Sequence, residues 1–156
     1  MALANRGVFA EKKVQDYLTW WMAASPWREF NRMVDSKSAG RIIKAAAADF
    51  EYFTDCNEDH AHGLIEVKQT EHDYRLARDK VTQLPRLRKR EKCGGQSYVV
   101  VYHSGLRKWR AVGVKYLTDT GDKGSWNLTN LPLFDTCGDA LHNLEPGRFP
   151  PFVKNA

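Results

Sequence analysis

The chain has 156 residues, a formal net charge of +5 and a hydrophobic content of 42%, which suit one folded domain rather than a disordered chain. It contains no apolar run close to the roughly 18 residues that a membrane span requires, and its first residues lack the apolar core of a signal peptide. Its three cysteines, at positions 56, 93 and 137, lack the spacing of a disulfide framework, so we expect reduced thiols and a cytoplasmic location.

The first predicted element is an amphipathic helix over residues 5–24. At about 100° per residue, its apolar side chains fall on an arc centred on Glu11. This arc contains Val8, Val14, Leu18 and Met22, with Trp21 at its edge. A carboxylate in the middle of an apolar stripe is costly unless it meets a cation or a metal ion. Glu11 is therefore a candidate site residue.

Three strands are predicted next, over residues 29–34, 47–53 and 64–69. A turn cluster at residues 36–40 separates the first two, and a polar loop at residues 54–63 separates the last two. The alanine-rich stretch 42–48 is also compatible with a helical start, which leaves the beginning of the second strand open.

A basic segment over residues 75–92 contains eight Lys or Arg residues and two acidic ones. Because Pro85 is tolerated only in a first helical turn, we expect the main helix to begin near Thr82 as N-cap and to end at Gly94 and Gly95. Residues 97–103 form a β-branched and aromatic run that predicts a buried central strand, and residues 109–114 predict another. Beyond residue 118 we predict only a short helix at 138–144, in a segment that either caps the sheet or forms a dimer contact.

Four charged residues carry the candidate chemistry. In the third strand, Glu66 and Lys68 are two residues apart and point to one face, while Ile65 and Val67 point to the other. A hairpin would bring Asp49 of the second strand beside Glu66, with Glu11 approaching from the helix. An oxygen-rich pocket of this kind suits Mg²⁺ or Mn²⁺ and hydrolysis of a phosphodiester. The plain alternative is a surface ion pair between Glu66 and Lys68 on an edge strand.

The order αβββαβ, with Asp in the second strand and Glu-Val-Lys in the third, resembles the PD-(D/E)xK nuclease superfamily. Within it, the chain is most similar to small phage-encoded and Holliday-junction-resolvase-like members. The resemblance covers residues 5–117 of a single nuclease domain, with residues 118–156 as a C-terminal extension. It implies an α/β (α+β) fold of the restriction-endonuclease type, in which helices flank a mixed central sheet. Ala48 stands where the superfamily pattern has proline.

The resemblance also implies a role for each site residue. Asp49 and Glu66 would bind the metal ion, helped by Glu11 and the carbonyl of Val67, and Lys68 would be the catalytic lysine. Many members have a glutamine on the helix after the third strand, and Gln83 is the candidate. Gln69, which would point to the opposite face from Lys68, is the second choice.

The predicted nucleic-acid contacts lie in two regions. Arg32, Lys37 and Arg41 flank the first turn, where turn chemistry accounts equally well for the neighbouring polar residues. The basic segment supplies Arg75, Arg78, Arg86, Arg88, Lys89 and Arg90. Such a run is often only a solvated helix face, but beside a nuclease site it favours contact with the phosphate backbone.

Two other groups of residues receive plainer interpretations. Cys56, His60 and His62 lie in the polar loop, but they lack the paired spacing of a zinc module, which favours a solvated loop. The five tryptophans favour core or dimer-interface positions over base-stacking platforms.

Together these observations predict a metal-dependent DNA endonuclease that acts on branched or structured DNA. The superfamily implies Mg²⁺ or Mn²⁺ as cofactor and, for a four-way junction, a homodimer. It also implies the host cytoplasm if the chain is phage-encoded. A linear-DNA exonuclease, an RNA-directed nuclease and a catalytically silent DNA-binding module remain the alternatives.

Overall fold

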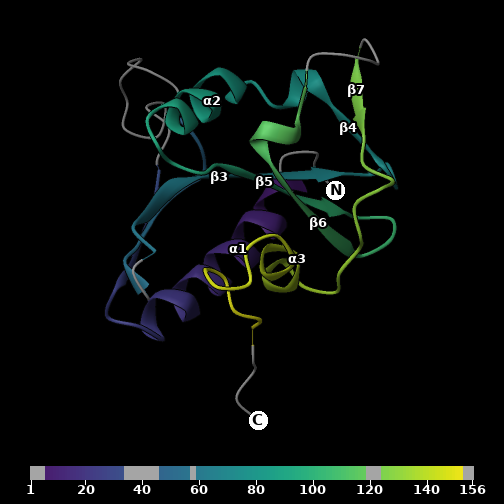
Figure 1. Cartoon of the computed structure of the whole chain (residues 1–156). Coiled ribbons are helices and arrows are strands. Elements are labelled where there is room, and N and C mark those ends of the chain that lie inside the picture. The colour runs from purple at the N-terminus through teal and green to yellow at the C-terminus, as the bar shows by residue number, and fades with distance from the viewer. Residues whose placement is uncertain (1–5, 34–45, 57–58, 119–123, 153–156) are drawn as a thin grey trace, which may run out of the picture.

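The computed structural model describes residues 6–33, 46–56, 59–118 and 124–152, which form a central sheet with helices on both faces (Figure 1). The main strands are β1 (Arg28–Arg32), β2 (Phe50–Thr54), β3 (Ala61–Thr70), β5 (Tyr98–His103) and β6 (Lys108–Gly113). Their order in the sheet is β1-β2-β3-β5-β6. Strands β3 and β5 are parallel and the other neighbours are antiparallel, so the sheet is mixed. The predicted fold class and the order αβββαβ are therefore confirmed.

Two helices cover one face of the sheet and one helix covers the other. Helices α1 (Arg6–Ala23) and α3 (Cys137–Leu144) pack below the sheet in the view of Figure 1, and α2 (Leu84–Lys92) lies above it. The parallel strands β3 and β5 are joined by a crossover through β4 (Arg75–Ala77), a 3₁₀ turn (Arg78–Lys80) and α2. A second 3₁₀ turn (Val114–Tyr116) follows β6 and packs against α2.

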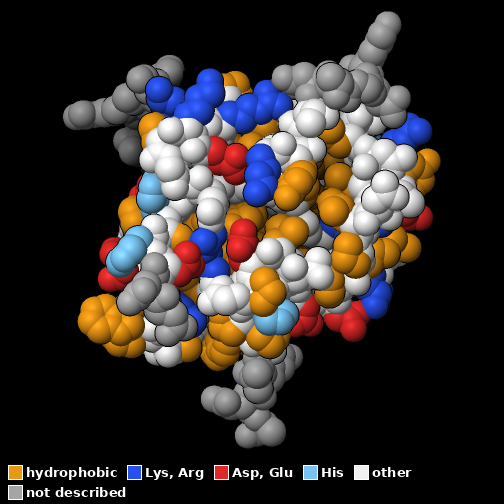
Figure 2. All heavy atoms as spheres, viewed as in Figure 1, with side chains coloured by type: hydrophobic (Ala, Val, Ile, Leu, Met, Phe, Trp, Pro, Cys, Tyr) orange, Lys and Arg blue, Asp and Glu red, His pale blue; other side chains and the backbone are white. Residues whose placement is uncertain are grey.

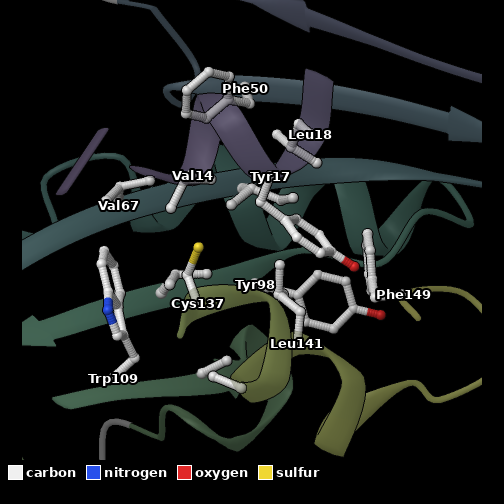
Figure 3. Close-up of a cluster of buried hydrophobic side chains, with 14 of the residues drawn as sticks. Val14, Tyr17, Leu18, Phe50, Val67, Tyr98, Trp109, Cys137, Leu141 and Phe149 are labelled. Atoms are coloured by element: carbon white, nitrogen blue, oxygen red, sulfur yellow. The ribbon is translucent and has the colours of Figure 1, made fainter. Parts of the chain in front are cut away.

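Strand alternation divides the core into two clusters. Ile65 and Val67 of β3 point toward α1, where they join a cluster rich in aromatic rings (Figure 3). Leu64 points to the opposite face, toward α2, and joins Val99, Val101 and Leu87. Since side chains alternate along a strand, Glu66 and Lys68 share the α2 face with Leu64. The buried run of β5 contributes to both clusters, as its β-branched sequence predicts.

The buried stripe of α1 is displaced from the predicted arc. Its fully buried side chains are Ala10, Val14, Tyr17, Leu18 and Trp21. At 100° per residue, these centre about 70° away from Glu11. Val8 and Met22, which were predicted to be buried, are exposed. Glu11 therefore stands at the edge of the stripe, where it is half-buried rather than enclosed by apolar side chains.

The segment after residue 123 caps the sheet, which was one of the two alternatives left open. α3 packs on β5 and β6, with Thr136 as N-cap accepting from the Asp139 N–H at 3.0 Å. Phe149 is fully buried among Trp21, Tyr52 and Tyr98. The short strand β7 (Ser125–Asn127) pairs with β4 in a separate two-stranded sheet.

Several predicted boundaries are wrong. β2 begins at Phe50, so Asp49 lies just before the strand rather than within it. β3 begins at Ala61, because Ala61–Gly63 pair with Tyr52–Thr54 and shorten the polar loop. Gln83, not Thr82, is the N-cap of α2, and Pro85 lies in the first turn. Within the described residues, no helix has the length and hydropathy to cross a membrane.

Gly63 is the position in β3 where a side chain is least tolerated. A Cβ atom there would lie 1.7 Å from the carbonyl oxygen of Gln96, which is backbone and cannot rotate away. We expect Gly63→Ala to lower the free energy of unfolding by about 3 kcal/mol, as measured by denaturant titration. Gly7→Ala is the matched control, because a Cβ at Gly7 meets nothing within 4 Å and alanine favours the helix. An unchanged midpoint for Gly63→Ala would contradict this packing.

Candidate active site

Three elements bring four charged side chains together. Glu11 comes from α1, Asp49 from the residues that lead into β2, and Glu66 and Lys68 from the α2 face of β3. A backbone hydrogen bond fixes Asp49 in place, because its carbonyl accepts from the Met33 N–H at 2.9 Å. Its Oδ2 accepts from the Val67 N–H at 2.7 Å. The Asp49 carboxylate acts electrostatically on Glu11, and Glu66 acts on Asp49, so Asp49 is the centre of the cluster.

Crowding of the carboxyl groups changes their proton affinity. Burial raises the pKa of Glu11 to about 7, and the hydrogen bond and negative charge of Asp49 add to this. Burial likewise raises the pKa of Asp49 to about 7, together with the hydrogen bond and charge of Glu66. Arg32 and Lys68 act in the opposite direction on the pKa of Glu11. The cluster therefore retains protons near neutral pH that a bound cation would displace.

Glu66 has an oxygen that the protein leaves unsatisfied. The residue is only 1% exposed, and its Oε1 lies 3.6 Å from the ammonium nitrogen of Lys68. Its Oε2 is buried and has no hydrogen-bond partner among the described residues. Leaving a buried carboxylate oxygen without a partner is costly, so a ligand at this position would stabilise the folded protein.

The donor set fits a hard divalent cation. Mg²⁺ typically binds through one or two carboxylates and keeps water or phosphate oxygens at its other positions. The described residues contain no group of three or more Asp, Glu, His or Cys side chains gathered tightly enough to form a ready-made metal cage. Asp49 and Glu66 therefore offer an open site, with Glu11 at its edge and the orphan Oε2 of Glu66 as its least satisfied donor.

Neither predicted glutamine has an established role at this cluster. The side-chain oxygen of Gln83 accepts from the Thr82 hydroxyl at 3.1 Å, on the exposed start of α2. Gln69 lies on the face of β3 opposite Lys68, as strand alternation predicts, and its side-chain oxygen is buried without a hydrogen-bond partner among the described residues.

The predicted nucleic-acid contacts are distributed around the cluster. Arg32 is exposed on the edge strand β1 and acts electrostatically on Glu11. Lys and Arg side chains form a band over α2 (Figure 2). In this part of the chain, Arg86 and Lys89 are exposed, while Arg88 donates to the carbonyl of Leu117 at 2.7 Å. Lys37 and Arg41 lie outside the described residues.

Other predicted contacts in the basic segment have partners within the protein. Arg90 forms an ion pair with Glu51 of β2. The guanidinium of Arg75 lies 5.4 Å from the ring centre of Tyr74, and that of Arg78 lies 5.2 Å from the ring centre of Trp126. These contacts fix the three arginine side chains in place. That Arg75, Arg78 and Arg90 contact DNA remains a prediction.

The sequence analysis did not identify Arg148, which positions the loop before β3. This buried side chain donates to both carboxylate oxygens of Asp59, at 2.8 and 2.9 Å, and to the Tyr98 hydroxyl at 2.8 Å. A single arginine in a Pro- and Gly-containing tail gives no sequence signal of such a role. In the same loop, His60 pairs with Asp55 and Cys56 contacts Ser25, an arrangement that favours the solvated loop over a zinc site.

The five-stranded mixed sheet, flanked by helices and with Glu66 and Lys68 on its central strand β3, matches the fold of a solved resolvase. Comparison with solved structures identifies a specific neighbour, the Hjc Holliday junction resolvase from the archaeal hyperthermophile Archaeoglobus fulgidus. The match has a TM-score of 0.50 and 18% sequence identity, and it covers 85% of this chain and 96% of the resolvase chain. At this identity the match establishes the fold. No family model and no curated protein matches the sequence.

Proposed function

We propose that this protein is a divalent-metal-dependent deoxyribonuclease that cleaves branched DNA. The observation that carries the proposal is the buried, unsatisfied Oε2 of Glu66 beside Asp49 and Lys68. The likeness to the archaeal resolvase supports the choice of a branched substrate. The basic residues over α2 support an anionic partner.

Each residue of the cluster has a role in this proposal. Asp49 and Glu66 would hold Mg²⁺ or Mn²⁺, with Glu11 and the carbonyl of Val67 completing the protein ligands. The bound ion would polarise the phosphoryl oxygen and lower the pKa of water. Lys68 is half-buried and lies close enough to Glu66 to orient the attacking water and to offset negative charge on the phosphate. Gln83 would fix the lysine or a phosphate, whereas Gln69, the second choice, lies on the opposite face of β3.

The test is cleavage of labelled DNA of four shapes: linear duplex, single strand, flap and four-way junction. Each is incubated with Mg²⁺, with Mn²⁺ or with EDTA. We expect cutting of the junction in either metal and none in EDTA, because a divalent ion held by the carboxylates would polarise the phosphoryl oxygen and lower the pKa of the attacking water. Binding of the junction without cleavage in any metal would favour a silent DNA-binding module. Preferential degradation from linear ends would favour an exonuclease, and cleavage of a matched RNA substrate in preference to DNA would favour an RNA-directed enzyme.

Salt dependence tests the basic surface over α2. Each phosphate contact contributes about 0.9 to the slope of log affinity against log salt concentration. We expect the double variant Arg86→Ala/Lys89→Ala to lower that slope by about 1 to 2 and to weaken junction binding at low salt. The matched control is Lys12→Ala on α1, which removes an exposed charge paired with Asp16. If the salt-dependence slope is the same for both variants and the wild type, the DNA does not contact Arg86 and Lys89.

A further inference from the structure

A second open depression lies on the sheet, away from the carboxylate cluster. It has a volume of about 570 Å³, within the range typical of ligand pockets. Its lining includes Trp27, Phe53, His60 and His62. Trp27 is 64% exposed and Phe53 is 40% exposed, so Trp27 is not one of the core tryptophans.

The backbone of Trp27 is anchored although its ring is exposed. The N–H of Trp27 donates to the Ser25 hydroxyl at 3.3 Å, and its carbonyl accepts from the Asp55 N–H at 2.9 Å. The second bond ties the start of β1 to the end of β2, so Trp27 and Phe53 border the same depression. An aromatic ring on an anchored backbone has only two side-chain torsions to order when a ligand stacks on it.

The depression continues the face that carries the proposed active site. Phe53 is the direct cross-strand partner of His62. Since side chains alternate along β3, His62 is on the same face as Glu66, four residues further on, a distance of roughly 13 Å along the strand. Between the two places Leu64 is buried against Leu87 of α2, so a DNA strand that reaches both passes beside α2 rather than along β3.

The charges around the depression suit a base better than a phosphate. Its lining contains the carboxylates of Glu29 and Asp55, of which Asp55 is paired with His60. The cation in the lining, Arg28, is engaged by the protein, since it donates to the Trp21 carbonyl at 3.1 Å and lies over the Trp21 ring. Carboxylates repel the DNA backbone but accept hydrogen bonds from the amino groups of cytosine and adenine. Aromatic and imidazole rings stack on any unpaired base.

We propose that this depression binds an unstacked, amino-bearing base of a single-stranded segment next to the cleavage position. The inference rests on the proposed nuclease function, and it extends that function to substrates that expose unpaired bases beside the site. A perfectly paired duplex would not fill the depression, because its bases are stacked on one another.

The experiment measures binding of a fluorescent ten-nucleotide deoxycytidine oligomer in EDTA, where no cleavage competes. We expect Trp27→Ala and Phe53→Ala each to weaken binding at least about fivefold, and Trp27→Phe to retain most of it. Tyr116→Ala is the control, since Tyr116 is 67% exposed but lies in the 3₁₀ turn after β6, outside the lining of the depression. Thermal melting followed by circular dichroism establishes that each variant is folded.

Two results would overturn the inference. Affinities of Trp27→Ala and Phe53→Ala within twofold of the wild type would show that the rings do not stack on bases. A thymidine oligomer bound as tightly as the deoxycytidine oligomer would exclude the selection of amino-bearing bases. Cleavage of the four-way junction by the wild type, measured in parallel, separates these failures from a failure of the proposed nuclease function.

Discussion

Replacing Lys68 with alanine should reduce metal-dependent cleavage by about 10²- to 10⁴-fold, the range expected when a group that orients or transfers a proton is removed. The ammonium of Lys68 lies 3.6 Å from Glu66 and is the only Lys or Arg nitrogen within 4 Å of that carboxylate among the described residues. DNA binding should change by less than about threefold, because the phosphate contacts are assigned to other residues. The rate is measured by single-turnover cleavage of a labelled junction, and binding by anisotropy in EDTA.

Lys12→Ala is the matched control for Lys68→Ala. It removes the same side chain from the exposed face of α1, where Lys12 contacts only Asp16 within its own helix. Its cleavage rate should equal that of the wild type. A Lys68→Ala protein that cleaves within threefold of the wild-type rate would reduce Lys68 to a counter-ion of Glu66.

The second prediction concerns stability, and its sign is unusual. Without a divalent cation, Asp49→Asn should be more stable than the wild type at pH 8. The pKa of Asp49 is raised from 3.8 to about 7 in the folded protein, chiefly by burial. A raised pKa means that the folded state binds a proton more tightly than the unfolded state. The contribution of Asp49 to stability is therefore fully present below about pH 4 and is lost as the pH rises through about 7.

At pH 8 the free energy of unfolding of Asp49→Asn should exceed that of the wild type by about 2 kcal/mol, after allowance for the partial exposure of Asp49. This difference corresponds to a melting temperature about 5 °C higher. Asparagine suits the test because its side-chain oxygen can still accept from the Val67 N–H. Melting in EDTA is measured at pH 5 and at pH 8, and the advantage of Asp49→Asn should shrink by more than half at the lower pH.

In the presence of Mg²⁺, the wild type should melt at a higher temperature than Asp49→Asn. A ligand at 100 times its dissociation constant stabilises the state that binds it by about 2.7 kcal/mol, so Mg²⁺ should raise the melting temperature of the wild type. Asp49→Asn should show little response. A variant that melts below the wild type in EDTA at both pH values would show instead that the Asp49 carboxylate is a structural hydrogen-bond acceptor.

Periodic segments of the sequence were predicted well because one physical requirement dominates each of them. The alternation in β3 assigns Ile65 and Val67 to one face and Glu66 and Lys68 to the other, whatever the neighbouring elements do. The run over β5 is too apolar for an exposed strand. The predicted hairpin was enough to place Asp49 beside the strand that contains Glu66, although the predicted start of β2 was three residues too early.

Other features depend on contacts between distant segments, which a sequence pattern does not encode. Strands β4 and β7 have three residues each, too few for a periodic signal, and they form only because Trp126 pairs with Leu76 across the sheet. The buried stripe of α1 differs from the predicted arc because α3 and Phe149 cover one side of the helix. The spacing of apolar residues within α1 does not show which side these distant segments cover. The exposure of Trp27 likewise follows from its place before β1 and not from its type.

The packing of Phe149 and Arg148 has a consequence for the order of events during synthesis. Arg148 contacts Asp59 and Tyr98, and Phe149 packs against Trp21, so contacts across 50 to 128 residues close late. A ribosome adding about 5 to 20 residues per second needs several seconds to pass from β5 to Phe149. During that interval the α1 face of the sheet lacks the part of its cover that α3 and Phe149 supply. A nascent chain at this stage exposes Tyr52 and Tyr98 to chaperones and to neighbouring chains, whereas the completed protein does not.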